Sequence, residues 1–357
     1  MRKAAVLLLT LLCTFSFAAA SCAESLLPFS AMKADVPDTW RQTFETVNGP
    51  VTIDVVIQLP DREALPLVEL GFHSFAEDDL AAACPQALVD ADPLRAMVQM
   101  GDFAACVYPE SASRCGWTAW PPESEYAENV SLSRTELEQR VLQLLHQLSL
   151  PDATDYQVTG VIAHSRTWLV DQDDTPVEPL NDHGYYNAYL QTTIHGVSVM
   201  NSFSFDHDNE TLHGPHVEAP QMNYFDDQNY TLYLSGYQIS KVLAEDCPLL
   251  PFAAILKEVE RLVATGHLRE IYRFELCYVP MWADDGKAIV AVPAWVIWGE
   301  YHEKATAPTN HEPAGYYQKV IGGYPLVIPA QTGKSLDYTN QSKDRWTAST
   351  YLTEEGR

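Results

Sequence analysis

The chain has 357 residues, 46% of them hydrophobic, which is enough for one large domain or two ordinary ones. Its 48 Asp and Glu residues outnumber its 22 Lys and Arg residues, so the formal net charge is −26. A surface this acidic repels phosphate backbones and argues against nucleic acid as a partner, while it suits the solubility of an exported protein.

The first 22 residues have the pattern of a secretory signal. Arg2 and Lys3 precede an apolar run that ends near residue 20 and is closed by small residues. This run is shorter than the roughly 20 apolar residues, with an anchoring flank, that a membrane-spanning helix needs. Residues 19–22, AASC, resemble a bacterial lipobox in which Ala19 stands where Leu is usual. Cys22 is therefore either a lipid anchor or an ordinary mature cysteine, and both alternatives place the protein outside the cytoplasm.

Cysteine pairing depends on the fate of Cys22. If the signal is removed and Cys22 is lipidated, five cysteines remain, and otherwise six. No pair has the CxxC spacing of a zinc ribbon or a thioredoxin-type centre. Pairing of nearest neighbours predicts two disulfides, Cys106 with Cys115 and Cys247 with Cys277.

A first structural unit is predicted at 49–205, after an N-terminal segment at 23–48. Residues 51–59 alternate between apolar and mostly polar side chains, as in a half-buried strand, and LVELGFH gives a second strand. Ser74 and Glu77 have capping-box spacing for a short helix that Pro85 ends. The region 85–129, rich in Pro, Ala, Trp and Cys, is interpreted as irregular with short helical pieces.

The rest of the first unit is predicted as one helix followed by strands. Ser133 and Glu136 form a capping box. The apolar residues that follow fall on one helical stripe: Leu137, Val141, Leu144, Leu145 and Leu148. Strands then continue to residue 205, with a turn at His195 and Gly196.

A polar connection is predicted at 206–228. It begins with DHDNETLHGPH, residues 206–216, which could bind a metal. As a calcium loop this stretch fails, because Thr211 replaces the glycine of the sharp turn and Val217 replaces the bidentate glutamate. Its three histidines are irregularly spaced for zinc or copper. We interpret it as a solvated acidic loop and predict no metal site.

A second unit is predicted at 229–357. Pro251 suits a first helical turn and Gly266 a C-terminal cap, around one apolar face. In the strand that follows, Tyr272, Phe274, Leu276 and Tyr278 are expected to share a face. The next strand is apolar on both faces, and its Pro293 suggests an edge, a bulge or a strand start. Each unit is thus one amphipathic helix followed by an antiparallel meander, which predicts an α+β fold.

Motifs of the common catalytic classes are absent from the sequence. It contains no GxSxG elbow, no HExxH, no GxxxxGKS or GxxxxGKT and no GxGxxG after a strand. We therefore predict no catalytic residue and no cofactor. Aromatic residues near the C-terminus could line a groove for glycan or peptide, although core packing is the favoured interpretation: Trp295, Trp298, Tyr316 and Tyr317.

Several segments resemble a bacterial lipoprotein family that is known only as a domain of unknown function. The similar segments are VTIDVVIQLPDREALPLVELGFHSFAEDDL, GYYNAYLQTTIHGVSV, NYTLYLSGYQISKVLAEDCPLLPFAAILKEV, ELCYVPM, AVPAWVIWGEY and PLVIPAQTGKSLD. The chain departs from that family at Gln331-Thr332-Gly333, where an Asp-Gly is expected, and at the lipobox. The predicted units also look like the PepSY/cystatin-like units of PepSY-type and YycI-type envelope proteins, which bind partners and are not catalysts.

The resemblance implies an exported, membrane-attached envelope protein that acts by protein or peptide interaction and carries no catalytic residues. The alternative is a secreted hydrolase that uses a carboxylate pair on a glycan or peptide. With 48 acidic residues, however, any chosen pair is most often solvated surface.

Overall fold

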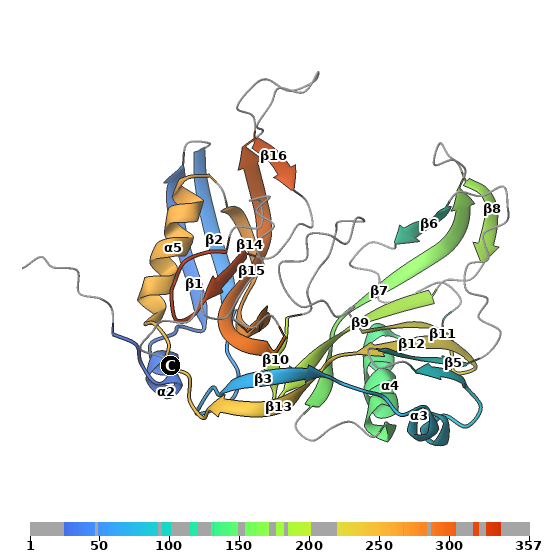
Figure 1. Ribbon diagram of the computed structural model, residues 1–357. Coiled ribbons are helices and arrows are strands. Elements are labelled where there is room, and N and C mark those ends of the chain that lie inside the picture. The colour runs from blue at the N-terminus through green and yellow to red at the C-terminus, as the bar shows by residue number, and fades with distance from the viewer. Residues whose placement is uncertain are drawn as a thin grey trace, which may run out of the picture.

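Two β-sheets lie side by side in the computed structural model, and each carries helices on one face (Figure 1). The structure describes residues 25–46, 49–91, 95–100, 114–119, 130, 132–148, 154–170, 176–181, 185–200, 220–266, 268–283, 287–304, 317–320 and 326–336. Within these ranges, no helix is long and apolar enough to cross a membrane.

Sheet I has eight strands in the order β1-β2-β14-β15-β3-β13, with β16 and β17 also paired to β15. β2 and β14 run parallel, and the other pairs are antiparallel. Helices α2 (Phe29–Ala34) and α5 (Phe252–Ala264) belong to this half. The strands are β1 (Thr39–Thr46), β2 (Gly49–Gln58), β3 (Leu67–Phe72), β13 (Tyr237–Ala244), β14 (Leu268–Trp282), β15 (Ile289–Lys304), β16 (Tyr317–Val320) and β17 (Leu326–Pro329).

Sheet II has nine strands in the order β4-β5-β12-β11-β9-β7-β6, with β8 paired to β7 and β10 to β9. Helices α3 (Glu77–Ala83) and α4 (Arg134–Gln147) lie on one of its faces. The strands are β4 (Leu88–Ala91), β5 (Arg95–Met100), β6 (Arg114–Ala119), β7 (Thr154–Val170), β8 (Pro176–Asn181), β9 (Tyr185–Ile194), β10 (Val197–Ser198), β11 (Gln221–Asp226) and β12 (Asn229–Ser235).

The predicted α+β class, with two helix-plus-antiparallel-meander units, is wrong. The described chain is mostly β, and neither sheet corresponds to one predicted unit. β2 and β3, expected in the first unit, pair with β14 and β15 from the second. β12 in turn joins sheet II by pairing with β5. The apolar pattern of a strand reports which side chains are buried, but it does not say which distant strand is the partner.

Strands also occupy segments that were predicted to lack them. The region 85–129 was expected to be irregular with short helical pieces, yet it contributes β4, β5 and β6. The predicted polar connection at 206–228 contains β11, which forms a hairpin with β12, while 206–219 lie outside the described residues. These strands are only four to six residues long, and such short runs give little periodicity to detect.

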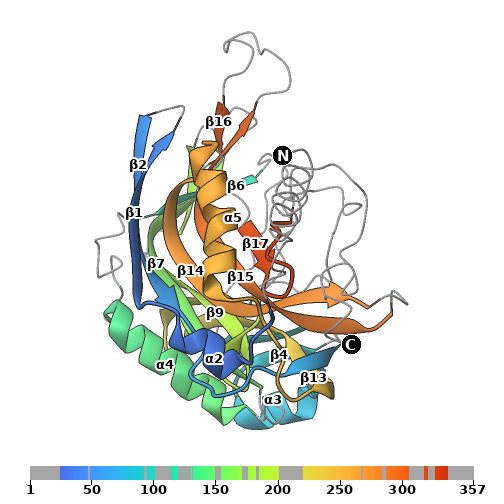
Figure 2. The same ribbon diagram turned by 90° about the vertical axis from the view of Figure 1, so that its left-hand side faces the viewer.

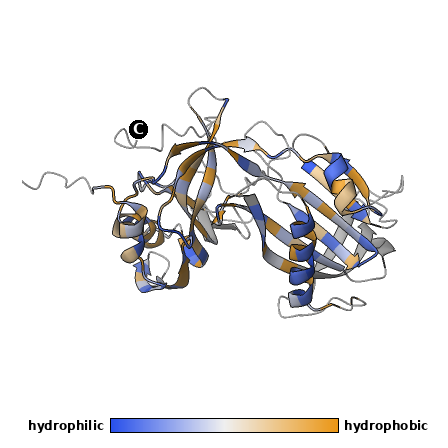
Figure 3. Ribbon diagram, turned by 90° about the horizontal axis from the view of Figure 1, so that it is seen from below, coloured by the Kyte–Doolittle hydropathy of each residue, from blue (hydrophilic) through white to orange (hydrophobic). Residues whose placement is uncertain are grey.

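The predicted helix after Ser133 is confirmed as α4. Ser133 accepts a hydrogen bond from the backbone of Glu136, and the Glu136 carboxylate accepts one from the backbone of Ser133. Leu137, Val141 and Leu145 are fully buried against sheet II. The outward side of this helix is hydrophilic, whereas hydrophobic residues dominate sheet I (Figure 3). The helix near residue 77 is also present as α3, but Ala76 rather than Ser74 is its N-cap, so that predicted cap is wrong.

The helix expected after Pro251 is confirmed as α5, which packs on the centre of sheet I (Figure 2). Phe252 lies 4.9 Å from Trp295 between ring centroids, and Phe274 lies 5.3 Å from Trp295. Gly266 has φ +76 just after the helix, the left-handed conformation that glycine adopts without strain. One aromatic cluster therefore joins α5 to the two longest strands of sheet I.

β14 and β15 explain two differences from the predicted strand pattern. A β-bulge between Ile271 and Arg273 turns Tyr272 outward, so Tyr272 is 58% exposed and does not share the buried face of Phe274. Pro293 lies inside β15, at none of the predicted positions. It falls between the segment paired with β3, which ends at Ala291, and the segment paired with β17, so its missing N–H breaks neither ladder.

The two sheets meet through short backbone contacts. The Met200 N–H donates to the Tyr278 carbonyl at 2.7 Å, which joins the end of the β9–β10 hairpin to β14. The His73 N–H donates to the Gly236 carbonyl at 3.0 Å, where the chain passes from each sheet to the other. A side chain at Gly236 would lie 2.8 Å from the Thr192 hydroxyl, so glycine permits this close approach.

The start of the described chain is fixed to sheet I. Leu27 and Leu249 exchange two backbone hydrogen bonds, of 2.7 and 2.8 Å. Leu249 is fully buried, and the segment that contains it leads directly into α5. The residues just before α2 are therefore joined to the segment before α5 by an isolated β-bridge.

Glu258 links α5 to the turn after β17. Its carboxylate accepts hydrogen bonds from the Arg261 guanidinium at 2.7 and 2.9 Å and from the Ser335 hydroxyl at 2.6 Å. These contacts, Arg261 first, lower the pKa of Glu258 below its usual value. A lowered carboxyl pKa stabilises the fold above the unfolded-state pKa, and this stability is lost as the pH falls through the folded-state pKa.

We expect Glu258→Gln to lower the free energy of unfolding by about 1 kcal/mol at pH 7. The difference from the native protein should vanish at a pH below the lowered pKa of Glu258, where both side chains are uncharged. Urea unfolding at pH 7 and at acid pH measures both values. Glu260→Gln, on the same helix, is the control; an equal loss of stability at pH 7 in both variants would contradict the role given to Glu258.

Candidate ligand-binding pocket

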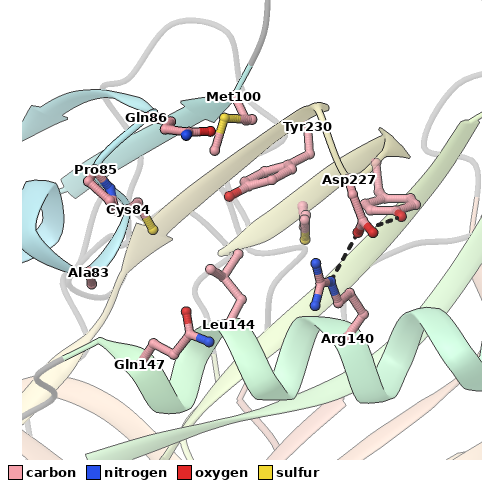
Figure 4. Close-up of a pocket in the computed structure, with 12 residues that line it drawn as sticks. Ala83, Cys84, Pro85, Gln86, Met100, Arg140, Leu144, Gln147, Asp227 and Tyr230 are labelled. Carbon is pink, nitrogen blue, oxygen red and sulfur yellow. Dashed lines mark hydrogen bonds and ion pairs between the residues drawn. The ribbon is translucent and has the colours of Figure 1, made fainter.

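A pocket of about 300 Å³ opens between α4, the end of α3 and sheet II (Figure 4). α4 contributes one flank of its surface, adjacent to the buried stripe. The turn after α3 forms the opposite wall, and the β11–β12 hairpin with the end of β5 forms the floor. The lining residues are Ala83, Cys84, Pro85, Gln86, Met100, Arg140, Leu144, Gln147, Met222, Tyr224, Asp227 and Tyr230.

One end of the pocket is polar. Arg140 Nε lies 3.0 Å from Asp227 Oδ1, and the Tyr224 hydroxyl donates to the same oxygen at 3.1 Å. Burial, and then the nearby Asp227 carboxylate, raise the pKa of Tyr224, so its hydroxyl stays protonated and can act as donor. The arrangement joins a helix to the β11–β12 turn and compensates the charge of Asp227.

The other end of the pocket is apolar, and its thiol is unreactive. Leu144, Met100 and Met222 supply flexible apolar surface, of the kind that adapts to varied partners. Cys84 is 4% exposed, and burial raises the pKa of its thiol despite a hydrogen bond from Tyr230. A thiol with a raised pKa is protonated at neutral pH and is a poor nucleophile.

This lining suits binding rather than proton transfer. Its charges are paired, its thiol is protonated, and Asp227 is the one carboxylate among the described lining residues. A carboxylate pair of the glycosidase type needs two such groups across the reacting bond. The pocket can accommodate an apolar side chain of a ligand beside Leu144 and Met100. Arg140 and the hydroxyls of Tyr224 and Tyr230 can bond a polar group of the same ligand.

The predicted disulfide between Cys247 and Cys277 is not formed, and both are buried free thiols. Tyr278 contacts the 65–66 segment on one face of β14, near Cys247, and Cys277 points to the opposite face because side chains alternate along a strand. Their sulfurs therefore cannot meet. Burial raises the pKa of Cys247 to about 12 and that of Cys277 well above normal. Cys106 lies outside the described residues, and only the backbone of Cys115 is described, in β6.

The predicted aromatic groove is not formed by Trp295, which is fully buried in the core beside α5. The favoured interpretation, core packing, holds for this residue. Trp298 is partly buried against the same core. Tyr316 lies outside the described residues, and Tyr317 is described only through its backbone in β16. Cys22 and the stretch 206–216 also lie outside, and no metal-binding cluster occurs among the residues that are described.

A buried polar group at the joint between the sheets was not predicted. Glu275 is 4% exposed on β14, and burial raises its pKa even though Arg273 lies beside it. Arg273 also donates to Gln191 of sheet II at 3.3 Å. A glutamate inside the otherwise apolar stretch 274–281 of β14 is a signal that could have identified this residue. Arg273, which bonds both Glu275 and Gln191, is the polar tie between the sheets.

Comparison with known proteins identifies the fold alone. No family model and no curated protein matches the chain. A solved structure of an uncharacterized protein from Eubacterium rectale is similar over 88% of this chain and 99% of that chain, with a TM-score of 0.54 and 14% sequence identity. A known protein therefore has a comparable arrangement along nearly its whole length.

Proposed function

We propose that the protein is an exported, membrane-attached envelope protein that acts without catalysis, by binding a protein or peptide in the extracytoplasmic space. The signal-like N-terminus, with the lipobox-like residues at 19–22, supports export and attachment. The segments that resemble bacterial lipoproteins of unknown function point the same way. The observation that carries the proposal is the pocket beside α4.

The pocket has the features of a site for one side chain of a larger partner. Its volume of about 300 Å³ lies at the lower end of small-molecule sites and accommodates a large apolar residue. Apolar anchors in such pockets contribute much of the binding energy at protein interfaces. Arg140 and Gln147, at the rim on α4, can bond the partner's backbone carbonyl groups.

Filling the pocket should weaken partner binding while leaving the fold intact. Gln147→Trp places a large ring at the pocket, and we expect it to weaken binding at least tenfold, about 1.4 kcal/mol. Gln139→Trp is the matched control, because Gln139 is an exposed glutamine of the same helix and does not line the pocket.

The measurement is crosslinking of each variant in the native cell envelope, followed by separation of the membrane fraction. A reproducible partner that is captured by the native protein and Gln139→Trp, but lost with Gln147→Trp, supports the proposal. The absence of a reproducible partner, or equal capture by both variants, would contradict the proposed function.

A further inference from the structure

Sheet II presents a second, different surface on the face away from α4. Successive residues of β9, β11 and β12 alternate between the core below α4 and this opposite face; Ala188, Met222 and Leu232 point to the core. The residues between them form two aligned rows, which we call the amide–tyrosine face. The first row is Tyr189, Gln221 and Tyr233, and the second is Asn187, Asn223 and Thr231.

The tyrosines of this face are accessible, with 36% of Tyr189 and 37% of Tyr233 exposed. They lie on strands two apart, with Gln221 between them in register. Neighbouring strands are ~4.8 Å apart, so the backbones of the two tyrosines are separated by about 10 Å. This spacing suits alternate sugars of one glycan chain, because directly linked pyranose rings lie closer together.

Two polar atoms of the second row have no hydrogen-bond partner among the described residues. The Thr231 hydroxyl is buried, in a residue only 1% exposed, and Asn187 Oδ1 is buried as well. Asn187 Nδ2, by contrast, donates to Gln221 at 3.4 Å. Buried polar groups are nearly always paired, and each unpaired one costs about 1–3 kcal/mol. Because both atoms are buried, a ligand hydroxyl can reach them only if neighbouring side chains move.

The charge of the face limits the ligand further. None of its six residues is charged, although the chain as a whole carries −26. An extended peptide binds mainly through backbone bonds at a sheet edge, but β9, β11 and β12 are interior strands whose backbone groups already pair. The available contacts are ring faces and amides. A sugar ring matches them, because its C–H faces stack on aromatic rings and its hydroxyls bond amides.

We propose that the amide–tyrosine face binds an uncharged polysaccharide. Tyr189 and Tyr233 stack on rings of one glycan chain, and Gln221, between them, bonds the hydroxyl groups. This site is separate from the pocket beside α4, and it adds a glycan ligand to the proposed protein or peptide partner.

The test is affinity gel electrophoresis of the folded protein through gels that contain a soluble neutral polysaccharide. The panel comprises an α-glucan, a β-glucan and a β-mannan, with carboxymethylcellulose as the charged counterpart. We expect at least one neutral polymer to retard the protein, and Tyr189→Ala and Tyr233→Ala each to weaken that binding about tenfold. Thermal unfolding confirms that each variant folds.

Tyr272→Ala is the matched control, because Tyr272 is an exposed tyrosine of sheet I, outside the face. It should bind as the native protein does, and Gln147→Trp should also retain glycan binding because the pocket is a separate site. No retardation by any neutral polymer, binding to the carboxymethyl polymer alone, or binding that both tyrosine variants leave unchanged would each overturn the proposal.

Discussion

Gly299→Ala should destabilise the protein by about 3 kcal/mol or more, because backbone occupies the space that a side chain needs. A Cβ added at Gly299 would lie 1.9 Å from the Glu270 carbonyl oxygen, at the bulged pairing of β14 with β15. Backbone atoms of two paired strands cannot separate without breaking ladder bonds. Urea unfolding, followed by far-ultraviolet circular dichroism, measures the loss.

Gly160→Ala is the matched control for this effect. Gly160 is also a strand glycine beside a bulge, in β7, but a Cβ there meets nothing within 4 Å. Alanine restricts the unfolded chain, so we expect a gain of about 0.5 kcal/mol rather than a loss. Similar values for the two variants would show that the close approach at Gly299 does not govern stability.

Trp295→Ala should cost about 4 kcal/mol, the scale found for large aromatic residues removed from cores. Trp295 is fully buried and touches Phe252 from α5 and Phe274 from β14. Its removal leaves a cavity between the helix and the sheet. Chemical denaturation gives the free energy, and loss of the near-ultraviolet aromatic signal reports the loosened cluster.

Trp295→Phe separates packing from the polar indole nitrogen. Trp295 Nε1 is buried without a hydrogen-bond partner in the described chain, so phenylalanine removes an unpaired donor while it keeps a ring in the cluster. We expect it to recover more than half of the stability lost in the alanine variant. A loss as large as that of Trp295→Ala would show that ring packing is not the cause.

Local structure followed closely from sequence wherever one side of an element was buried. The alternation in residues 51–59 corresponds to β2, whose Ile53, Val55 and Ile57 are buried. The Ser133 capping box and the turn at His195 and Gly196 are also present, the turn with positive φ at both residues. Each of these signals involves neighbours within a few residues, so the chain itself contains the physical cause.

Sheet partners and the pocket could not be predicted in the same way. β2 joins β14 across more than two hundred residues, and no local pattern encodes that pairing. The pocket likewise combines the turn at Cys84, Arg140 of α4 and Asp227 of the β11–β12 turn. Its residues are ordinary surface and core types when taken one at a time. Only their assembly by the two-sheet fold gives them a shared site.

The pairing of Leu27 with Leu249 limits how far the folded protein can lie from a lipid anchor at Cys22. If Cys22 carries the lipid, four residues lie between the anchor and Leu27, the first fixed residue, which makes five residue-to-residue steps. An extended chain spans at most ~3.6 Å per residue, so the segment from Cys22 to Leu27 is no longer than about 18 Å. Sheet I would then stay close to the headgroups, and the protein could not sample the space far from the bilayer. Any protein or glycan that it captures would have to come to the membrane surface.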